Sequence, residues 1–349
     1  MKNCFTILLF MLAFAAAHLA SAQNIRRVNN SGLNVSGVNV YTTLQAAHDA
    51  ASSGDFIYLE PTNISYGNLT CVRPLTIVGN GYFLQQNTGL QADTREAVVG
   101  TITFAAGSAG SRLTGCTVNG NMYILANAIT IERNLLAGVA TYVGYNGSSS
   151  YASVNGTIIR QNYFNGNDLY LYPSATSTVG NVSIANNILS SASITSSGNY
   201  SNMAGILISN NVIGALAGTS SDGIQVDNAV IKNNILTYTG SNTVFTARNN
   251  AYSYNISGGT AFGTANGNQQ NITPASLLVG AAGTPDGAFR LRAGSPAIGT
   301  GESGTDVGAF GGTLPYRLAG IPNVPTIYQY SQSVSGNSLN VTISTRSNN

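Results

Sequence analysis

A pattern of apolar and polar positions repeats along the middle of the chain. Six phrases between residues 129 and 252 place an apolar residue three positions before an asparagine, usually another five positions before it, and an apolar pair after it. The asparagines are Asn134, Asn162, Asn187, Asn211, Asn234 and Asn250, separated by 28, 25, 24, 23 and 16 residues. Apolar residues two positions apart, mostly β-branched, predict short strands with one buried face. A self-similar period in the low twenties predicts a solenoid.

The residue types between the apolar positions indicate which solenoid this is. The strands are too short for helices, and Gly and Asn are frequent where the chain must turn. These features favour an all-β fold, a parallel β-helix whose coils stack about 4.8 Å apart. In such a fold the repeated asparagines are expected to form a structural ladder, because backbone groups at a corner need new hydrogen-bond partners and the asparagine amides can supply them. Ligand binding by these asparagines is the alternative interpretation.

The two ends of the chain differ from the repeats. Residues 1–22 combine Lys2, an apolar run and the small-residue site Ala20-Ser21-Ala22, which is typical of a secretory signal peptide. We therefore expect a secreted or cell-surface protein, cleaved near Ala22, without a membrane span. Residues 41–60 predict a short helix that caps the N-terminal end of the solenoid, with His48 facing solvent, followed by a strand.

Two motifs carry a resemblance to a known family. Pro74-Leu-Thr-Ile-Val-Gly-Asn-Gly81, after the helix and a Gly-Asp turn, is similar to the opening of right-handed parallel β-helix proteins of the pectate-lyase-like superfamily. The run from Phe289 to Gly299, followed by residues 306–312, resembles the closing motif of secreted bacterial members, although Gly299 stands where that motif usually has Asp. The resemblance implies a single-stranded right-handed parallel β-helix over residues 23–312. The resemblance also suggests that residues 313–349 form a tail like those of Bacteroidetes proteins. The alternation over 338–344 predicts a strand within this extended tail, and we expect the tail to fold back onto the solenoid.

The charge composition limits the classes of partner that the protein is expected to bind. The chain has 14 Lys and Arg against 12 Asp and Glu, and no segment concentrates positive charge, so nucleic acid is not an expected partner. Cys71 and Cys116 occupy different points of the repeat, which argues against a disulfide between them.

Catalytic residues of the family are not recognisable. The resemblance implies Asp or Glu ligands for Ca²⁺ with an Arg or Lys base in lyases, and clustered Asp in hydrolases. The best local group is Asp222, Asp227 and Lys232, and the alternative is that Asp222 forms a turn and Asp227 caps a corner. Ca²⁺ is expected only if the protein is a lyase; otherwise no cofactor is expected.

A second group suits binding. Tyr142 and Tyr170 each lie eight residues after a repeat asparagine, so they should stack on neighbouring coils, with Asp168 and Tyr172 on the same strand face as Tyr170. Exposed aromatic rings beside a carboxylate match the apolar face and hydroxyls of a sugar. Because the chain is rich in tyrosine, ordinary surface tyrosines are the alternative. We therefore expect a polysaccharide-binding or adhesive protein, with a polysaccharide lyase or glycoside hydrolase and a structural spacer as the other hypotheses.

Overall fold

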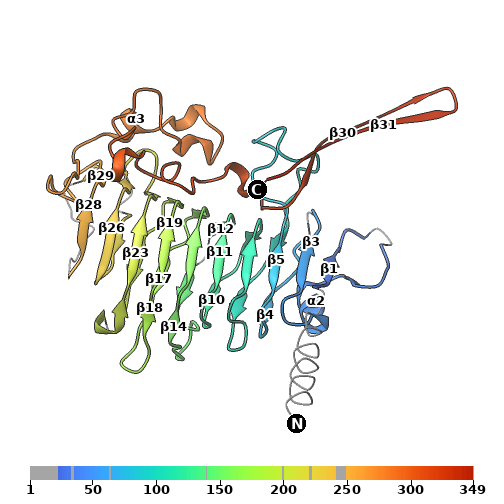
Figure 1. Ribbon diagram of the computed structural model, residues 1–349, viewed down its shortest axis with the longest axis horizontal. Helices are drawn as coiled ribbons and strands as arrows, with labels where there is room; N and C mark the ends of the chain where they lie inside the picture. Colours follow the sequence, from blue (N-terminus) through green and yellow to red (C-terminus); the bar gives the residue numbers. More distant parts are fainter. Residues whose placement is uncertain are drawn as a thin grey trace, which may run out of the picture.

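The repeats fold into a parallel β-helix (Figure 1). The structure is a computed structural model that describes residues 23–32, 35–62, 64–138, 140–198, 200–219, 222–240 and 249–348. Three long sheets run along the solenoid, and within each the neighbouring strands are parallel and come from successive coils. The all-β solenoid expected from the sequence is confirmed. The expected signal peptide lies outside the described residues.

The three sheets divide the strands as follows. Sheet A contains β2 (Val40–Tyr41), β1 (Ile25–Val28), β3 (Phe56–Leu59), β5 (Thr76–Val78), β8 (Arg112–Thr114), β11 (Thr130–Glu132), β15 (Ile158–Arg160), β19 (Ser183–Ala185), β23 (Ile206–Ser209), β26 (Ala229–Lys232) and β28 (Ala251–Ser253). Sheet B contains β4 (Leu69–Cys71), β7 (Ile102–Phe104), β10 (Met122–Ile124), β13 (Thr141–Val143), β17 (Leu169–Leu171), β21 (Ile194–Ser196) and β25 (Ile224–Gln225). Sheet C contains β6 (Val98–Val99), β9 (Thr117–Val118), β12 (Leu135–Ala137), β16 (Tyr163–Asn165), β20 (Ile188–Ser190), β24 (Val212–Ile213), β27 (Ile235–Leu236) and β29 (Ile256–Ser257).

The remaining elements are short. A small sheet joins β14 (Val154–Asn155), β18 (Val179–Gly180) and β22 (Met203–Ala204). Among the described residues, the helices are α2 (Leu44–Ala50) and α3 (Pro274–Leu277), with single 3₁₀ turns η2 (Tyr200–Asn202), η3 (Gly280–Ala282), η4 (Gly287–Phe289), η5 (Glu302–Gly304) and η6 (Leu318–Gly320).

Helix α2 packs against the first strands of the solenoid. The Thr43 hydroxyl accepts a hydrogen bond from the Ala46 N–H, and Leu44 and Ala47 are buried. His48 does not face solvent as expected: its side chain is buried, and its Nε2 accepts a hydrogen bond from the Val72 N–H at 3.1 Å. This histidine therefore ties the helix to the chain that follows β4.

The apolar column of the repeat fills the interior. Ile131, Ile159, Ile184, Ile208 and Ile231 pair in register along sheet A and are fully buried. Stacking like residues on successive coils gives each branched side chain the same neighbours above and below, which favours close packing. Cys71 and Cys116 are buried and unbridged.

Sheet C is buried on its outer face as well. Residues 274–323, which we call the C-terminal cover, lie along this sheet (Figure 1). They pack Leu277, Phe289, Val307, Ala309 and Tyr316 against a second apolar column on the sheet. That column consists of Leu135, Tyr163, Ile188, Val212, Ile235 and Ile256. The apolar pair after each repeat asparagine thus serves two cores, one inside the solenoid and one under the cover.

Polar side chains at one corner of the coil hold the cover in place. Each belongs to the residue directly before a ladder asparagine, whose backbone is left-handed, with φ between 55° and 57°. These residues are Arg133, Gln161, Asn186, Asn210 and Asn233. Their side chains bond in turn to Ile321, Pro315, Gly311, Asp306 and Glu302. The cover therefore runs back along the solenoid, antiparallel to the order of the coils. At each of these corners the left-handed conformation is taken by the residue before the ladder asparagine and not by the asparagine itself.

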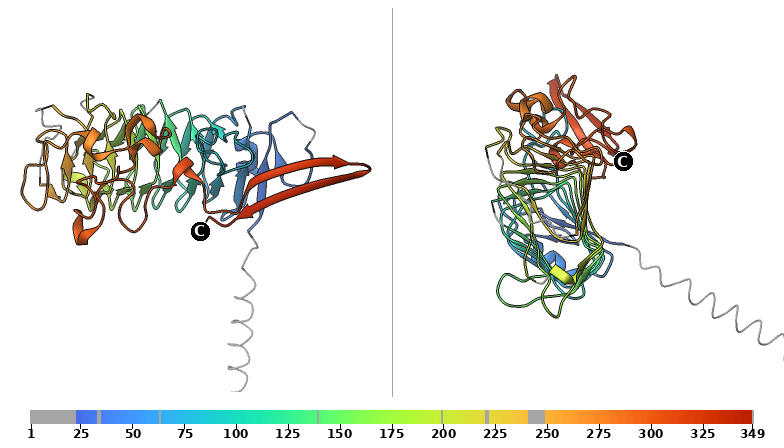
Figure 2. Two further views of the ribbon diagram at one scale, coloured as in Figure 1. Left: turned by 90° about the horizontal axis from the view of Figure 1, so that it is seen from above. Right: turned by 90° about the vertical axis from the view of Figure 1, so that its left-hand side faces the viewer.

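The last residues leave the solenoid surface. After the cover, β30 (Thr326–Ser335) and β31 (Ser338–Arg346) form an antiparallel hairpin that projects past the N-terminal coils (Figures 1 and 2). The strand expected over 338–344 lies within β31, whereas its partner β30 was not expected. The described part of the predicted tail is therefore only partly folded back, because the hairpin formed by β30 and β31 projects outwards while its base stays at the cover.

Candidate functional site

Three tyrosines form a row on the outer face of sheet B. Tyr123, Tyr142 and Tyr170 occupy equivalent positions on β10, β13 and β17. The ring centroids of Tyr123 and Tyr142 lie 5.5 Å apart with planes 9° from parallel, and those of Tyr142 and Tyr170 lie 5.3 Å apart at 15°. The predicted stacking of Tyr142 on Tyr170 is present. The row extends to Tyr123, which is seven residues after Cys116 in the asparagine column and so is missed by counting eight.

Three further tyrosines pack beside this row. Tyr145 stacks on Tyr172 with centroids 4.8 Å apart, and Tyr151 lies 5.1 Å from Tyr145. Tyr142 contacts both Tyr145 and Tyr172, so the six rings form one continuous group. We call Tyr123, Tyr142, Tyr145, Tyr151, Tyr170 and Tyr172 the tyrosine cluster. Sequence counting found three of the six, because the other three are supplied by a loop and by a coil of different length.

Asp168 lies at the edge of the cluster. One of its carboxylate oxygens accepts a hydrogen bond from the Tyr170 hydroxyl at 3.1 Å, and the other accepts one from the Ser193 N–H at 2.8 Å. Burial and the neighbouring Asp168 charge raise the pKa of Tyr170 to about 12. At neutral pH the Tyr170 phenol is therefore protonated and can donate a hydrogen bond. Asn121 adds an amide, which donates to the Tyr123 hydroxyl at 2.8 Å.

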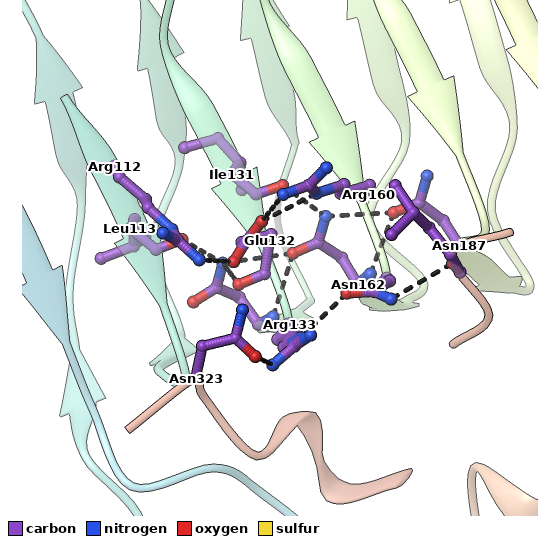
Figure 3. Close-up of polar contacts among 12 residues, drawn as sticks. Arg112, Leu113, Ile131, Glu132, Arg133, Arg160, Asn162, Asn187 and Asn323 are labelled. Atoms are coloured by element: carbon purple, nitrogen blue, oxygen red, sulfur yellow. Dashed lines mark hydrogen bonds and ion pairs between the residues drawn. The ribbon is translucent and has the colours of Figure 1, made fainter. Parts of the chain in front are cut away.

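The repeat asparagines form the expected ladder (Figure 3). In each step the side-chain oxygen of one asparagine accepts from the backbone N–H and the amide of the previous one, at 2.9–3.1 Å. Each amide also donates to a carbonyl of the preceding coil; Asn162, for example, donates to the Ile131 carbonyl at 2.9 Å. The ladder side chains are fully buried, so they stabilise corners and are closed to a ligand.

Asn250 does not belong to this ladder. The step after Asn234 is made by Asn255, followed by Asn268. Strand β28 pairs Tyr252 with Ile231, so Tyr252 occupies the position three before the ladder asparagine. Asn250 instead caps another corner, where its side chain bonds to the Ala229 N–H and the Val226 carbonyl. The short step of 16 residues reflected a misassigned repeat.

The weak catalytic candidates do not gather around Lys232. This lysine pairs with Glu302 of the cover, with Nζ 2.6 Å from the carboxylate oxygen. Asp227 is buried at the corner before β26. The pKa of Tyr252 is raised because the Tyr252 side chain is partly buried and because the Asp227 charge lies nearby. Asp222 lies just before β25. Over the described ranges, no three His, Cys, Asp or Glu residues are grouped so that they could hold a metal ion.

A buried carboxylate lies on sheet A instead (Figure 3). Glu132 is 1% exposed and forms ion pairs with Arg112 of the coil before and Arg160 of the coil after. Burial raises the pKa of this carboxyl group, but the two guanidinium groups more than compensate, so its pKa lies below the usual value of 4.5. Because both oxygens are held by arginines, Glu132 links three coils and is not placed to act as a base.

Comparison with known proteins gave no relative: the chain matches no family model and no curated protein. Within the described part of the chain, no helix is both long and apolar enough to cross a membrane.

Proposed function

We propose that the protein binds polysaccharide through the tyrosine cluster. The observation that carries the proposal is the register of Tyr123, Tyr142 and Tyr170, which lines up three partly exposed rings on the outer face of sheet B. Sugar rings pack their C–H faces on aromatic rings, and their hydroxyls bond to phenols, amides and carboxylates. Asp168 and Asn121 supply the last two groups beside the rings.

The geometry also indicates how a sugar chain would lie. The three rings stack on one another, so their open ring faces are at the two ends of the row. There the next residues in register are Thr103, beside Tyr123, and Thr195, beside Tyr170. Both side chains are smaller than a tyrosine ring, so the row ends there, and Gly147 of the loop after β13 lies against the Tyr123 ring. A polymer that contacts both ends must run along the solenoid axis, across the ring edges between them.

Binding measurements test the proposal directly. We expect the purified protein to bind at least one member of a panel of neutral and acidic polysaccharides, measured by affinity electrophoresis and calorimetry. Tyr142→Ala and Tyr170→Ala should each weaken this binding roughly tenfold, as loss of a central aromatic contact does. Tyr330→Ala, on the projecting hairpin, is the matched control and should bind as the unmodified protein does. Equal binding by all three variants would refute the assignment to the tyrosine cluster.

We further propose that the chain belongs to the pectate-lyase-like superfamily of right-handed β-helix proteins and is exported, as similar Bacteroidetes proteins are. The two motifs that carry the resemblance support this: Pro74–Gly81 contains β5, and the closing motif contributes Phe289 and Ala297 to the cover. Export is tested by expression in a bacterial host. Mass spectrometry of the extracellular protein should then find Gln23 at its N-terminus.

The lyase or hydrolase hypothesis has weaker support, because Lys232 is already paired with Glu302. It makes a separate prediction. If the protein cleaves a uronate polymer with these residues, with or without Ca²⁺, Lys232→Met and Asp227→Asn should each abolish the ultraviolet absorbance of the unsaturated product. The spacer hypothesis predicts neither binding nor cleavage.

A further inference from the structure

Four arginines from distant parts of the chain line one pocket beside the C-terminal cover. Arg133 comes from the solenoid, Arg290 and Arg317 from the cover, and Arg346 from the end of β31. The pocket has a volume of about 370 Å³, and its other lining residues are apolar or uncharged: Leu90, Tyr316, Leu318, Ile321, Ser347 and Asn348. Positive charge is therefore concentrated at one place on a chain that is otherwise nearly balanced.

None of the four arginines forms an ion pair with an Asp or Glu side chain of the described residues. Two buried carboxylates of the same region, Glu132 and Asp286, are bonded to other groups. Glu132 is held by Arg112 and Arg160, while Asp286 accepts hydrogen bonds from the Ala319 N–H and the Asn87 amide. A charged guanidinium group commonly forms an ion pair with a carboxylate or phosphate where one is within reach.

Among the lining residues of the pocket, one buried donor lacks an acceptor. Arg133 is buried and gives its Nε–H to Gln161 and its Nη1 to the cover. Burial lowers the pKa of Arg133 to about 10; the Glu132 carboxylate opposes this shift, and the nearby Arg317 adds to it. Arg346 donates from Nη2 to the Leu90 carbonyl, but its buried Nε–H has no acceptor among the described residues. A buried donor without an acceptor costs stability, and a bound anion would supply one.

We propose that this pocket binds an oxyanion group, a carboxylate, sulfate or phosphate, carried by a small molecule or by the acidic unit of a polysaccharide. Guanidinium groups bind such groups through paired N–H···O bonds. The volume is in the range of small-molecule sites, so the pocket has room for a sugar acid as well as for an inorganic anion. The site is separate from the tyrosine cluster, which lies on sheet B, and the inference does not depend on the function proposed for that cluster.

Exposed arginines allow a test that spares the fold. Arg290 and Arg317 are solvent-exposed, so replacing both with Gln removes two charges without opening the core. Arg292→Gln is the matched control: it removes an exposed arginine two residues from Arg290 that does not line the pocket. The probes are inorganic sulfate, galacturonate and galactose, each titrated by calorimetry into the full chain at constant ionic strength. Galactose differs from galacturonate by the carboxylate alone.

We expect sulfate and galacturonate to bind saturably at millimolar concentration, with one site per chain, and galactose not to bind. The double variant should bind them at least about tenfold more weakly, because charge-assisted hydrogen bonds are lost. Arg292→Gln should bind as the unmodified protein does. Tighter binding of galacturonate than of sulfate would identify a sugar acid as the source of the oxyanion, and the reverse would identify a free inorganic anion. The proposal is overturned if neither anion binds saturably, if the double variant binds them equally well, or if galactose binds as tightly as galacturonate.

Discussion

The outer faces of sheets C and B belong to the same coils, but one is buried under the C-terminal cover and the other is partly exposed to solvent. On sheet C the outward column is Leu135, Tyr163, Ile188, Val212, Ile235 and Ile256, and the C-terminal cover buries it. On sheet B the outward column is Thr70, Thr103, Tyr123, Tyr142, Tyr170, Thr195 and Gln225, and every one of these residues keeps some exposure to solvent. An aliphatic column must be covered to stabilise the fold, whereas tyrosines and threonines place a polar atom in water. The difference indicates which face contributes more to stability and which stays in contact with solvent.

The largest expected effect tests the covered face. Phe289→Ala removes a buried ring that packs against Tyr163, at a centroid distance of 6.0 Å, and should lower the free energy of unfolding by about 3–5 kcal/mol. Tyr142→Ala on the open face should cost about 1–2 kcal/mol, since its ring is already partly in water. Urea unfolding of both variants measures the difference. Equal losses would show that the two faces are energetically alike.

A ladder variant tests the solenoid beneath both faces. Asn211→Ala removes a side chain that bonds to Ile184, Asn187 and Asn234, and should cost about 1–3 kcal/mol for each buried backbone group left without a partner. Asn250→Ala is the control, because this asparagine lies outside the ladder and is partly exposed, and it should cost less. Thermal unfolding gives both values. Unchanged stability together with lost polysaccharide binding in Asn211→Ala would contradict the structural role of the ladder.

An acid titration examines the third face, on sheet A. The lowered pKa of Glu132 means that the folded chain holds this carboxylate ionised at a pH where the unfolded chain is protonated. Its contribution to stability is therefore present above about pH 4.5 and is lost as the pH falls through the lower folded pKa. Glu132→Gln should reduce stability at neutral pH by about 1–2 kcal/mol, because the two arginines are about one-third exposed. The variant should also flatten the acid limb of a plot of unfolding free energy against pH, and an unchanged limb would remove Glu132 as its source.

The smallest effect is spectroscopic and concerns the open face. Asp168 contributes to the raised pKa of Tyr170, after burial. Asp168→Asn should move this pKa down from about 12 towards the ordinary value of 10, followed as phenolate absorbance during an alkaline titration. Tyr170→Phe identifies the band. A titration that Asp168→Asn leaves unchanged would mean that the carboxylate does not influence the ring.

Sequence analysis predicted correctly those features that recur in every repeat. The isoleucine and asparagine columns predicted the sheets and the ladder. Tyr142 and Tyr170 each follow a ladder asparagine by eight residues, and residues at the same distance from the ladder lie next to each other on stacked coils. The sequence therefore also predicted that Tyr142 stacks on Tyr170. The prediction was wrong at Asn250, where Asn255 takes the ladder position instead. It could not foresee the Lys232–Glu302 pair or the four-arginine pocket, because these join segments far apart in the chain whose spacing follows no period.

The direction of the C-terminal cover has a consequence for the order in which the molecule is completed. A solenoid can add coils one at a time as the chain emerges from the ribosome. Here the outer side chains of Leu135 and Tyr163 are covered by residues that follow them by more than a hundred positions, Phe289 and Tyr316 among them. The apolar column on sheet C of the early coils therefore stays exposed to solvent until almost the entire chain has been synthesised. A molecule cut short before the cover would keep that column exposed and be prone to self-association.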